Sequence, residues 1–384
     1  PAISLPEKEH RMIYLDYAAN TPADPRVLAR FCEIEQSFVG NANSGHEAGR
    51  MAAQELARVT ESVAGLLGVA PSEIIYTSGA SESNNLAVKG LLRAATHAGK
   101  HVISTPLEHS SVGACLDELQ KEGYQIDLLN LDRDGKINLQ HLRSLLTQDT
   151  ALVAVCAVDS ELGIVQPIAR IAEILKDYPA CRLHVDATQA VGKTELVLDG
   201  VDILSLAPHK FYGLNGSGLL IKRRNVELYP LIQGGASVTA YRSGTRTLAL
   251  GAALETALRL ALAHSAEWTG IVEKHNLALR RALSAYPEVI VNSPDDAVPH
   301  ILNLSVKGVK GTVFQRALNE FGVCVSVKSA CSTDGQPSKA VLAVCHDSRN
   351  ALSSWRISLS HLTTDEEIGE FIKIFDRCYQ KLVK

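Results

Sequence analysis

Hydrophobic positions recur with two different periods along residues 46–260. In 46–68 they recur every three to four residues and the stretch ends in a glycine, which predicts an amphipathic helix. Further helical patterns separate short apolar runs that are typical of strands. These runs lie at 73–79, 101–109, 124–131, 151–158, 182–188, 202–210 and 216–223. The alternation predicts an α/β domain with a largely parallel sheet covered by helices.

The pattern changes beyond residue 260. A long helical tract, 246–287, leads to a smaller α+β unit. That unit is expected to contain a strand at 300–306, a helix at 311–322, a strand at 323–327 and a final helix from about Thr364. A chain of 384 residues is long for a single core, so we expect two domains. The large domain is placed at 14–257, and the small domain at 1–13 and 258–384.

Composition limits the classes of protein that the chain can belong to. Apolar residues make up 46%, charged residues 21%, and the net charge is −4, which offers no basic stripe for nucleic acid and no attraction to anionic membranes. The start of the chain carries charges where a secretory signal needs an apolar run, and the run 151–158 is too short to span a bilayer. The eight cysteines match neither a disulfide framework nor a familiar zinc spacing. We expect a soluble, cytoplasmic protein without a structural metal.

Two charged residues follow neighbouring predicted strands. Asp186 lies in the run 182–188, and Lys210 ends the run 202–210, so both side chains are expected at the same end of adjacent strands. Lys210 stands between an apolar strand and a glycine-rich turn, where loss of solvent favours a nucleophilic amine. Taken alone, Lys210 is also typical of a surface lysine, and Asp186 of a helix cap.

A third segment, 76–88, reads as a strand, a turn of small residues and a helix that begins near Ser81 and Glu82. Free backbone N–H groups and the helix dipole make such a start a phosphate-binding cup. The alternative is an ordinary capping box. The glycines of 213–218 lack the G-x-G-x-x-G order and do not open a helix, so dinucleotide binding is not expected.

Together, these three features meet the needs of pyridoxal 5′-phosphate (PLP). A lysine forms a Schiff base with the PLP aldehyde, an aspartate keeps the pyridine nitrogen protonated, and the cup holds the phosphate. His109 follows another predicted strand and can stack on the ring. A hydrogen-bonded loop histidine is the alternative reading of His109.

The chain resembles the cysteine desulfurases of the NifS/IscS type, PLP enzymes of fold type I in the class V aminotransferase family. The resemblance runs from "YLDYAANTP" at 14–22 to "TTDEE" at 363–367. The motifs between them are, in order, "YTSGASESNNLA", "LEHSSV", "HVDATQAVGK", "HKFYGLNGSG", "YRSGT", "SACST" and "SSWRISL". The resemblance implies a large domain with a mainly parallel, seven-stranded sheet between helices. It also implies a smaller α+β domain that carries a loop with Cys331.

The resemblance assigns roles around the cofactor. Lys210 forms the Schiff base, Asp186 pairs with the pyridinium, and His109 stacks on the ring and acts as acid or base. Gln189 bonds the ring hydroxyl, and Ser160 stands where the family has an asparagine that contacts the ring and the substrate.

It also assigns the phosphate contacts. Ala80, Ser81 and His209 help to hold the phosphate. Thr245 reaches the phosphate of the partner subunit, which implies a homodimer with composite active sites.

For the substrate, the resemblance assigns the carboxylate of L-cysteine to Arg356 and a further contact to Asn41. A structural ion pair is the alternative reading of Arg356. Cys331, set among small polar residues in 325–335, is the nucleophile that takes the substrate sulfur as a persulfide and releases L-alanine. The persulfide then passes to an acceptor protein, an iron–sulfur cluster assembly scaffold or a thiolation carrier.

Several positions depart from the family pattern. Ser160 replaces the asparagine, and Ala207 replaces a serine that donates to the phosphate, a loss of about 1.5–3 kcal/mol for one hydrogen bond to a charged group. The segment 234–241 is "GGASVTAY" where the family is richer in glycine. Lys328, three residues before Cys331, is expected to favour the Cys331 thiolate. These changes spare Lys210 and Cys331, which favours a divergent active enzyme.

Two kinds of alternative remain open. A PLP-dependent cysteine or cystine C–S lyase would eliminate sulfur and give pyruvate without needing Cys331, and a selenocysteine lyase would use the same residues. The other kind of alternative is a protein that is not an enzyme, a dimeric binding module. The catalytic residues present in the sequence argue against it.

Overall fold

The computed structural model describes residues 12–94, 99–235, 240–327 and 336–383. This part of the chain divides into two compact units. The large unit comprises Asn20–Ser160 and Ile164–Ala266. The small unit comprises the described residues up to Ala19, Glu161–Gly163 and the residues from Glu267 onward.

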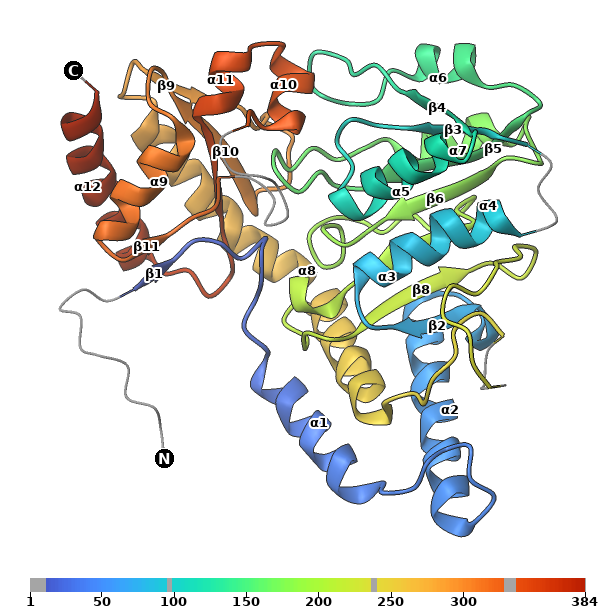
Figure 1. Ribbon diagram of the computed structural model, residues 1–384. Coiled ribbons are helices and arrows are strands. Elements are labelled where there is room, and N and C mark those ends of the chain that lie inside the picture. The colour runs from blue at the N-terminus through green and yellow to red at the C-terminus, as the bar shows by residue number, and fades with distance from the viewer. Residues whose placement is uncertain (1–11, 95–98, 236–239, 328–335, 384) are drawn as a thin grey trace. The chain divides into compact units, whose positions relative to one another are not determined.

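A seven-stranded sheet forms the centre of the large unit (Figure 1), in the order β2-β8-β7-β6-β5-β3-β4. Its strands are β2 (Ile74–Thr77), β3 (His101–Ser104), β4 (Gln125–Leu128), β5 (Thr150–Cys156), β6 (Arg182–Asp186), β7 (Ile203–Leu206) and β8 (Gly218–Lys222). The pairs from β4 through β7 are parallel, and β8 runs antiparallel to β7 and β2. Every residue of β5, β7 and β8 is buried, as expected for strands covered on both faces. The predicted mainly parallel, seven-stranded sheet is confirmed.

The large unit also contains helices. They are α1 (Pro25–Ser37), α2 (Glu47–Leu67), α3 (Ala80–Asn85), α4 (Leu91–Arg93), α5 (Ser110–Lys121), α6 (Leu139–Leu145) and α7 (Ile168–Leu175), with short turns η1 (Pro71–Glu73), η2 (Leu86–Gly90) and η3 (Pro208–Lys210). Buried residues of η2, α4 and α5, among them Leu86, Leu91 and Leu119, share one apolar cluster with strands of the sheet. Helix α2 ends at Gly68, in the left-handed conformation at φ 65°, as the sequence pattern predicts.

The small unit contains two groups of strands. The antiparallel sheet β12-β10-β9 is formed by β9 (Val289–Val291), β10 (Ile301–Val306) and β12 (Ser354–Ser358). A short parallel pair joins β1 (Ile13–Tyr14) to β11 (Val323–Cys324). The strand expected over 323–327 is therefore shorter, because Ser326 forms a separate bridge with Arg356.

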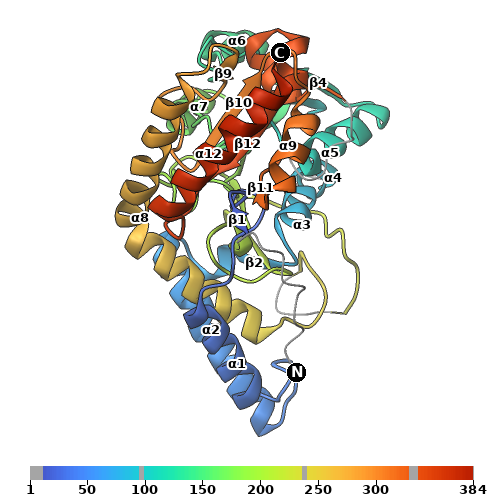
Figure 2. The same cartoon turned by 90° about the vertical axis from the view of Figure 1, so that its left-hand side faces the viewer.

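The helices that lie wholly within the small unit are α9 (Gly311–Glu320), α10 (Lys339–Cys345), α11 (Ser348–Ser353) and α12 (Asp365–Leu382). An aromatic core holds α9 and α12 to the strands of this unit. Phe314 of α9 stacks on Trp355 of β12 at 5.3 Å between ring centroids, and Phe371 and Phe375 of α12 join the same cluster. Figure 2 shows α9 and α12 side by side over the strands. Thr364 caps α12 in a capping box, at the predicted start.

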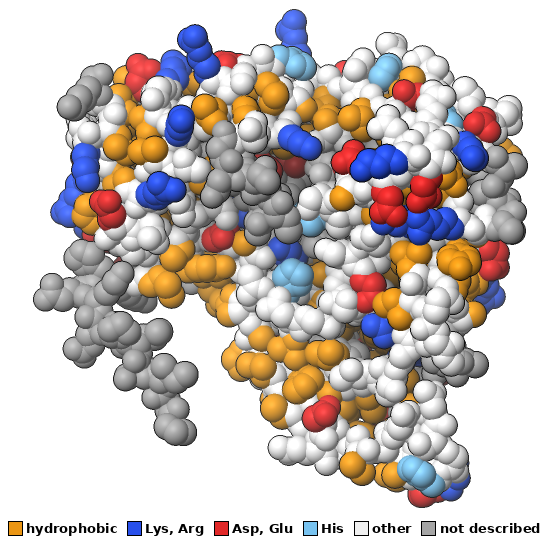
Figure 3. Space-filling model, viewed as in Figure 1, with side chains coloured by type: hydrophobic (Ala, Val, Ile, Leu, Met, Phe, Trp, Pro, Cys, Tyr) orange, Lys and Arg blue, Asp and Glu red, His pale blue; other side chains and the backbone are white. Residues whose placement is uncertain are grey.

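Helix α8 (Leu248–Leu283) is continuous over 36 residues and contains the boundary between the two units. In the ranges that the structure describes, no helix is both long and apolar enough to cross a membrane. On the face drawn in Figure 3, acidic and basic side chains are interspersed rather than gathered by sign.

Candidate active site

Asp186 and Lys210 lie at the same edge of the sheet of the large unit. Strands β6 and β7 are parallel, and Asp186, the last residue of β6, pairs in register with Ser205. Lys210 follows β7 within the short turn η3. The predicted placement of both residues after neighbouring parallel strands is confirmed by this register.

The carboxylate of Asp186 is buried and hydrogen-bonded. The residue is 5% exposed. Asn84 of α3 donates from Nδ2 to Oδ2 at 2.7 Å, and the backbone N–H of Thr188 donates to Oδ1 at 2.9 Å. These two N–H donors, one on each oxygen, fix the orientation of the carboxylate at the carboxyl end of β6.

His109 lies close to both groups. It is the N-cap of α5, and its Nδ1 accepts a hydrogen bond from the backbone N–H of Ser111 at 3.2 Å. In the neutral imidazole the proton is therefore on Nε2. Burial lowers the pKa of His109, Asp186 raises it and Lys210 lowers it further, so the three side chains act on one another electrostatically.

The turn that carries Lys210 is fixed by contacts with Thr21. The Thr21 hydroxyl donates to the carbonyl of His209 at 3.0 Å and accepts from the N–H of Tyr212 at 2.8 Å. Tyr212 adopts a positive φ of 65°, which is rare outside glycine. A Cβ on Gly213 would lie 2.3 Å from the Cβ of Pro208. Burial, with Lys210 and Lys193 nearby, lowers the pKa of His209 to about 4.

The predicted phosphate cup lies between β2 and α3. Its N-cap residue is Gly79, which has no side chain to accept from the first N–H groups of the helix. Ser81 is inside the helix, so it is not the cap that the alternative reading required. Glu82 accepts from the N–H of Ser78 at 2.7 Å and from Nε of Arg242 at 2.9 Å.

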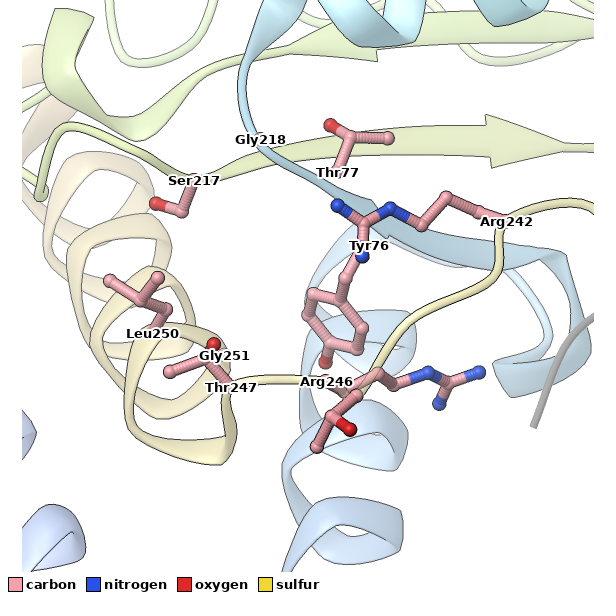
Figure 4. A pocket seen from close by; sticks show the side chains of 10 residues that line it. Tyr76, Thr77, Ser217, Gly218, Arg242, Arg246, Thr247, Leu250 and Gly251 are labelled. Carbon is pink, nitrogen blue, oxygen red and sulfur yellow. The ribbon is translucent and has the colours of Figure 1, made fainter. Parts of the chain in front are cut away.

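Thr245 lines a small cavity beside this turn. The cavity has a volume of about 130 Å³, and its polar lining includes Thr77, Ser217, Arg242 and Thr245. Figure 4 shows the side chain of Arg242 reaching toward Tyr76, with Ser217 on the opposite side.

The remaining predicted residues of the large unit are distributed around these turns. Gln189 is buried, and its Oε1 accepts from Nζ of Lys193 at 2.5 Å. Ser160 is half-buried in the segment that follows β5. Asn41 is exposed in the connection between α1 and α2, where its Oδ1 accepts from the N–H of Asn43 at 2.9 Å.

The residues present fit PLP. A lysine, a buried carboxylate, a neutral imidazole and uncapped N–H groups of a helix start are the donor set that the cofactor requires. Beside Asp186, the buried Oδ1 of Asn84 and Oγ1 of Thr188 find no hydrogen-bond partner among the described residues. Sequence reasoning missed Asn84, Thr188 and Thr21. All three lie within motifs quoted above, Thr21 in 14–22, Asn84 in 76–87 and Thr188 in 184–193, which was the available signal.

Arg356 belongs to the small unit, where it is 2% exposed on β12. Its Nη2 lies 2.9 Å from Oδ1 of Asp16, and Asp16 Oδ2 accepts from the hydroxyl of Ser326 at 2.8 Å. Arg356 and Ser326 also exchange backbone hydrogen bonds at 2.7 and 3.2 Å. The structural ion pair that the sequence left open is therefore present.

Cys331 and Lys328 lie outside the described residues. The chain on either side of them is anchored within the small unit. Ser326 is held by Asp16 and Arg356, and Ser338 caps α10 and donates to Glu161 Oε2 at 2.5 Å.

Comparison with known proteins gives consistent matches over nearly the whole chain. The Aminotransferase class-V family model matches residues 13–371. A NifS/IcsS protein homolog of Lactobacillus delbrueckii subsp. bulgaricus is 36% identical over 379 residues, covering 97% of this chain and 98% of that protein. The cysteine desulfurase IscS of Proteus mirabilis is 36% identical over 370 residues, covering 94% and 91%. A solved NifS-like protein has a TM-score of 0.91 at 30% identity, covering 97% of this chain and 100% of that one.

The chain belongs to the class V aminotransferases, PLP-dependent enzymes, and within them to the cysteine desulfurases of the NifS/IscS type. The predicted family, the PLP fold type I and the dependence on PLP are thereby confirmed.

Proposed function

We propose that this chain converts L-cysteine to L-alanine and passes the sulfur, as a persulfide on Cys331, to an acceptor protein. The observation that carries the proposal is the group formed by Asp186, His109 and the turn of Lys210, in a chain of the cysteine desulfurase family. Bound PLP supplies an electron sink for the carbon skeleton of the substrate.

The side chains of the large unit would divide the work at the cofactor. Lys210 would hold the cofactor through its aldehyde and would take the proton from Cα of the substrate. Asp186, oriented by the hydrogen bonds from Asn84 and Thr188, would hold the proton on the pyridine nitrogen. His109 covers the ring and, because its Nδ1 is occupied as an acceptor, donates or accepts through Nε2.

Other residues would hold the cofactor in place. Backbone N–H groups of Ala80 and Ser81, together with His209, bind the phosphate, since Gly79 leaves the start of α3 uncapped. Gln189 bonds the ring hydroxyl, and Ser160 takes part of the role of the family's asparagine.

Arg356 would bind the substrate carboxylate, and Asn41 would make a further contact with the substrate. The Cys331 thiolate attacks the substrate sulfur and the C–S bond breaks. The electron pair of that bond stays with the carbon skeleton of the substrate. Cβ takes up a proton, the proton taken by Lys210 returns to Cα, and the product leaves as alanine. Atoms and electrons balance without an outside oxidant, because the sulfur leaves as the zero-valent sulfur of a persulfide.

The products formed from L-cysteine in the presence of a reductant test this proposal. The wild type should give equal amounts of alanine and sulfide, and Cys331→Ala should lose both. Pyruvate with sulfide, in amounts that the substitution leaves unchanged, would identify a C–S lyase instead. The same assay with selenocysteine measures the preference between the two chalcogens.

We further propose a homodimer in which Thr245 contacts the phosphate of the neighbouring subunit, and a cytoplasmic location. The exposed position of Thr245 supports the first, and the free state of every cysteine in the described ranges supports the second. The sulfur acceptor is proposed to be an iron–sulfur scaffold or a thiolation carrier.

A further inference from the structure

Glu108 is a carboxylic acid at the edge of the site that the reaction outlined above does not use. It immediately precedes His109 in the turn between β3 and α5. The residue is half-buried as a whole, but its Oε2 is inaccessible to solvent and finds no hydrogen-bond partner among the described residues. A buried carboxyl with one unsatisfied oxygen requires a physical explanation.

The other carboxyl oxygen fastens the turn to the sheet. Oε1 of Glu108 accepts from the hydroxyl of Thr105 at 2.7 Å and from the backbone N–H of Cys156 at 2.9 Å. Cys156 ends β5 and pairs in register with Asp186. The side chain therefore connects the backbone just before His109 to the residue beside Asp186.

The charges around Glu108 are negative. Asp186 approaches from β6, and Asp159 acts on Cys156 from the segment after β5. The Cys156 thiol, with its pKa raised by burial and these carboxyls, contributes no positive charge. Burial, with a contribution from Asp186, raises the pKa of Glu108 from 4.5 to about 8. The hydrogen bonds from Thr105 and Cys156 lower it by less.

We propose that Glu108 is a positioning residue that, as an uncharged carboxylic acid, tethers the His109 turn to β5 without placing a second negative charge beside Asp186. The proposal concerns the protein itself and holds whichever sulfur product the enzyme forms. An ionised Glu108 would add a second negative charge near Asp186. That charge would favour the protonated, charged form of the neighbouring His109.

Infrared spectroscopy of the PLP-free protein tests the protonation state directly. At pH 7 the wild type should show the C=O band of a protonated carboxylic acid, which Glu108→Gln should lack and the matched control Glu35→Gln, on the surface of α1, should retain. The band should disappear as the pH rises through about 8. A wild-type spectrum identical to that of Glu108→Gln at pH 7 would overturn the proposal.

Thr105→Val keeps the test decisive if Glu108→Gln does not fold. Loss of the Thr105 hydroxyl removes a hydrogen bond that lowers the pKa of Glu108. The band of this variant should therefore shift in frequency and persist to a higher pH than in the wild type. An unshifted band would belong to another carboxyl and would contradict the assignment.

Stability against pH gives an independent readout. Because the folded-state pKa is raised, the proton is bound more tightly in the folded protein, and stability falls as the pH rises from about 4.5 to about 8. Relative to Glu108→Gln, the unfolding equilibrium constant of the wild type should rise about tenfold per pH unit in this window. Equal slopes in both proteins would contradict the proposal.

The tether is tested by cofactor affinity, measured from PLP absorbance. Glu108→Gln keeps an acceptor at Oε1, whereas Glu108→Ala loses both hydrogen bonds. Glu108→Ala should therefore bind PLP about tenfold more weakly than Glu108→Gln. Equal affinities of the two variants would show that the turn is held without Glu108.

Discussion

At the scale of single residues, Arg356, which is proposed to bind the substrate carboxylate, already forms an ion pair with Asp16. Arg356 is almost completely buried, and its ion pair with Asp16 supplies the negative charge that a buried guanidinium requires. A substrate carboxylate that binds Arg356 would have to share the guanidinium with Asp16. Asp16 was not among the residues predicted from the sequence, although it lies in the quoted motif at 14–22.

Asp16→Asn is expected to have opposite effects on stability and on binding. Loss of the charge should cost about 2 kcal/mol of unfolding free energy, less than the 3–5 kcal/mol of a fully buried pair, because asparagine still accepts a hydrogen bond and the Asp16 side chain is 19% exposed. The KM for L-cysteine should fall, because a competing carboxylate is removed. Chemical denaturation and steady-state kinetics measure the two effects.

The control is Glu370→Gln in α12, which removes the exposed pair with Lys373 and should change neither quantity appreciably. A rise in KM for Asp16→Asn would show that Asp16 orients Arg356 for the substrate rather than competing with it.

At the scale of elements, the start of α3 depends on close contact with β8. An ideal Cβ on Gly218 would lie 2.6 Å from the Cα and the carbonyl carbon of Gly79. Only glycine allows the first residue of β8 to pass this near the turn that is proposed to bind phosphate.

Gly218→Ala should therefore displace that turn. We expect a loss of about 1–3 kcal/mol in unfolding free energy from overpacking. PLP affinity should fall at least about tenfold through weakened phosphate contacts. Absorbance titration and denaturation measure the two effects.

Gly270→Ala in α8 is the control, since nothing lies within 4 Å of its Cβ position and helix propensity should raise stability by about 0.5–1 kcal/mol. Unchanged PLP affinity in Gly218→Ala would separate this turn from the cofactor.

The elements themselves were largely predictable. Strand runs and helix ends have local signals, such as the glycine after α2 and the capping box at Thr364. The contacts that fix the site have no such local signals in the sequence. The partners of Asn84, Thr21 and Glu108 are 102, 188 and 48 positions away along the chain, so periodicity and motif spacing carry no information about them. The bridge at Ser326, which shortens β11, likewise depends on a distant strand.

At the scale of the whole molecule, the proposed homodimer predicts that active sites are completed between subunits. Lys210→Ala would remove the proposed cofactor anchor, and Thr245→Ala would remove the proposed phosphate contact, worth about 1.5–3 kcal/mol. If Thr245 serves the partner's site, a heterodimer of the two single variants contains one complete site and should regain activity. Purified mixed dimers assayed with L-cysteine and limiting PLP measure this.

The reciprocal heterodimer shows whether Thr245 acts in the active site of the partner subunit or in that of its own subunit. Wild type paired with Lys210→Ala/Thr245→Ala should be impaired, because its only intact lysine then lacks the partner's threonine. Full activity of that pair, with none in the first, would place Thr245 in the site of its own subunit.

The backbone pairing of Ser326 with Arg356 has a consequence for evolution and protein engineering. The residue proposed to bind the substrate carboxylate also contacts Ser326, which precedes the segment that contains Cys331, and the Arg356 side chain shares Asp16 with the Ser326 hydroxyl. A substitution of Arg356 that changes substrate binding would therefore also alter sulfur transfer. We expect substrate range and sulfur-transfer efficiency to change together in laboratory evolution of this enzyme, and second-site revertants to arise at Asp16 and Ser326.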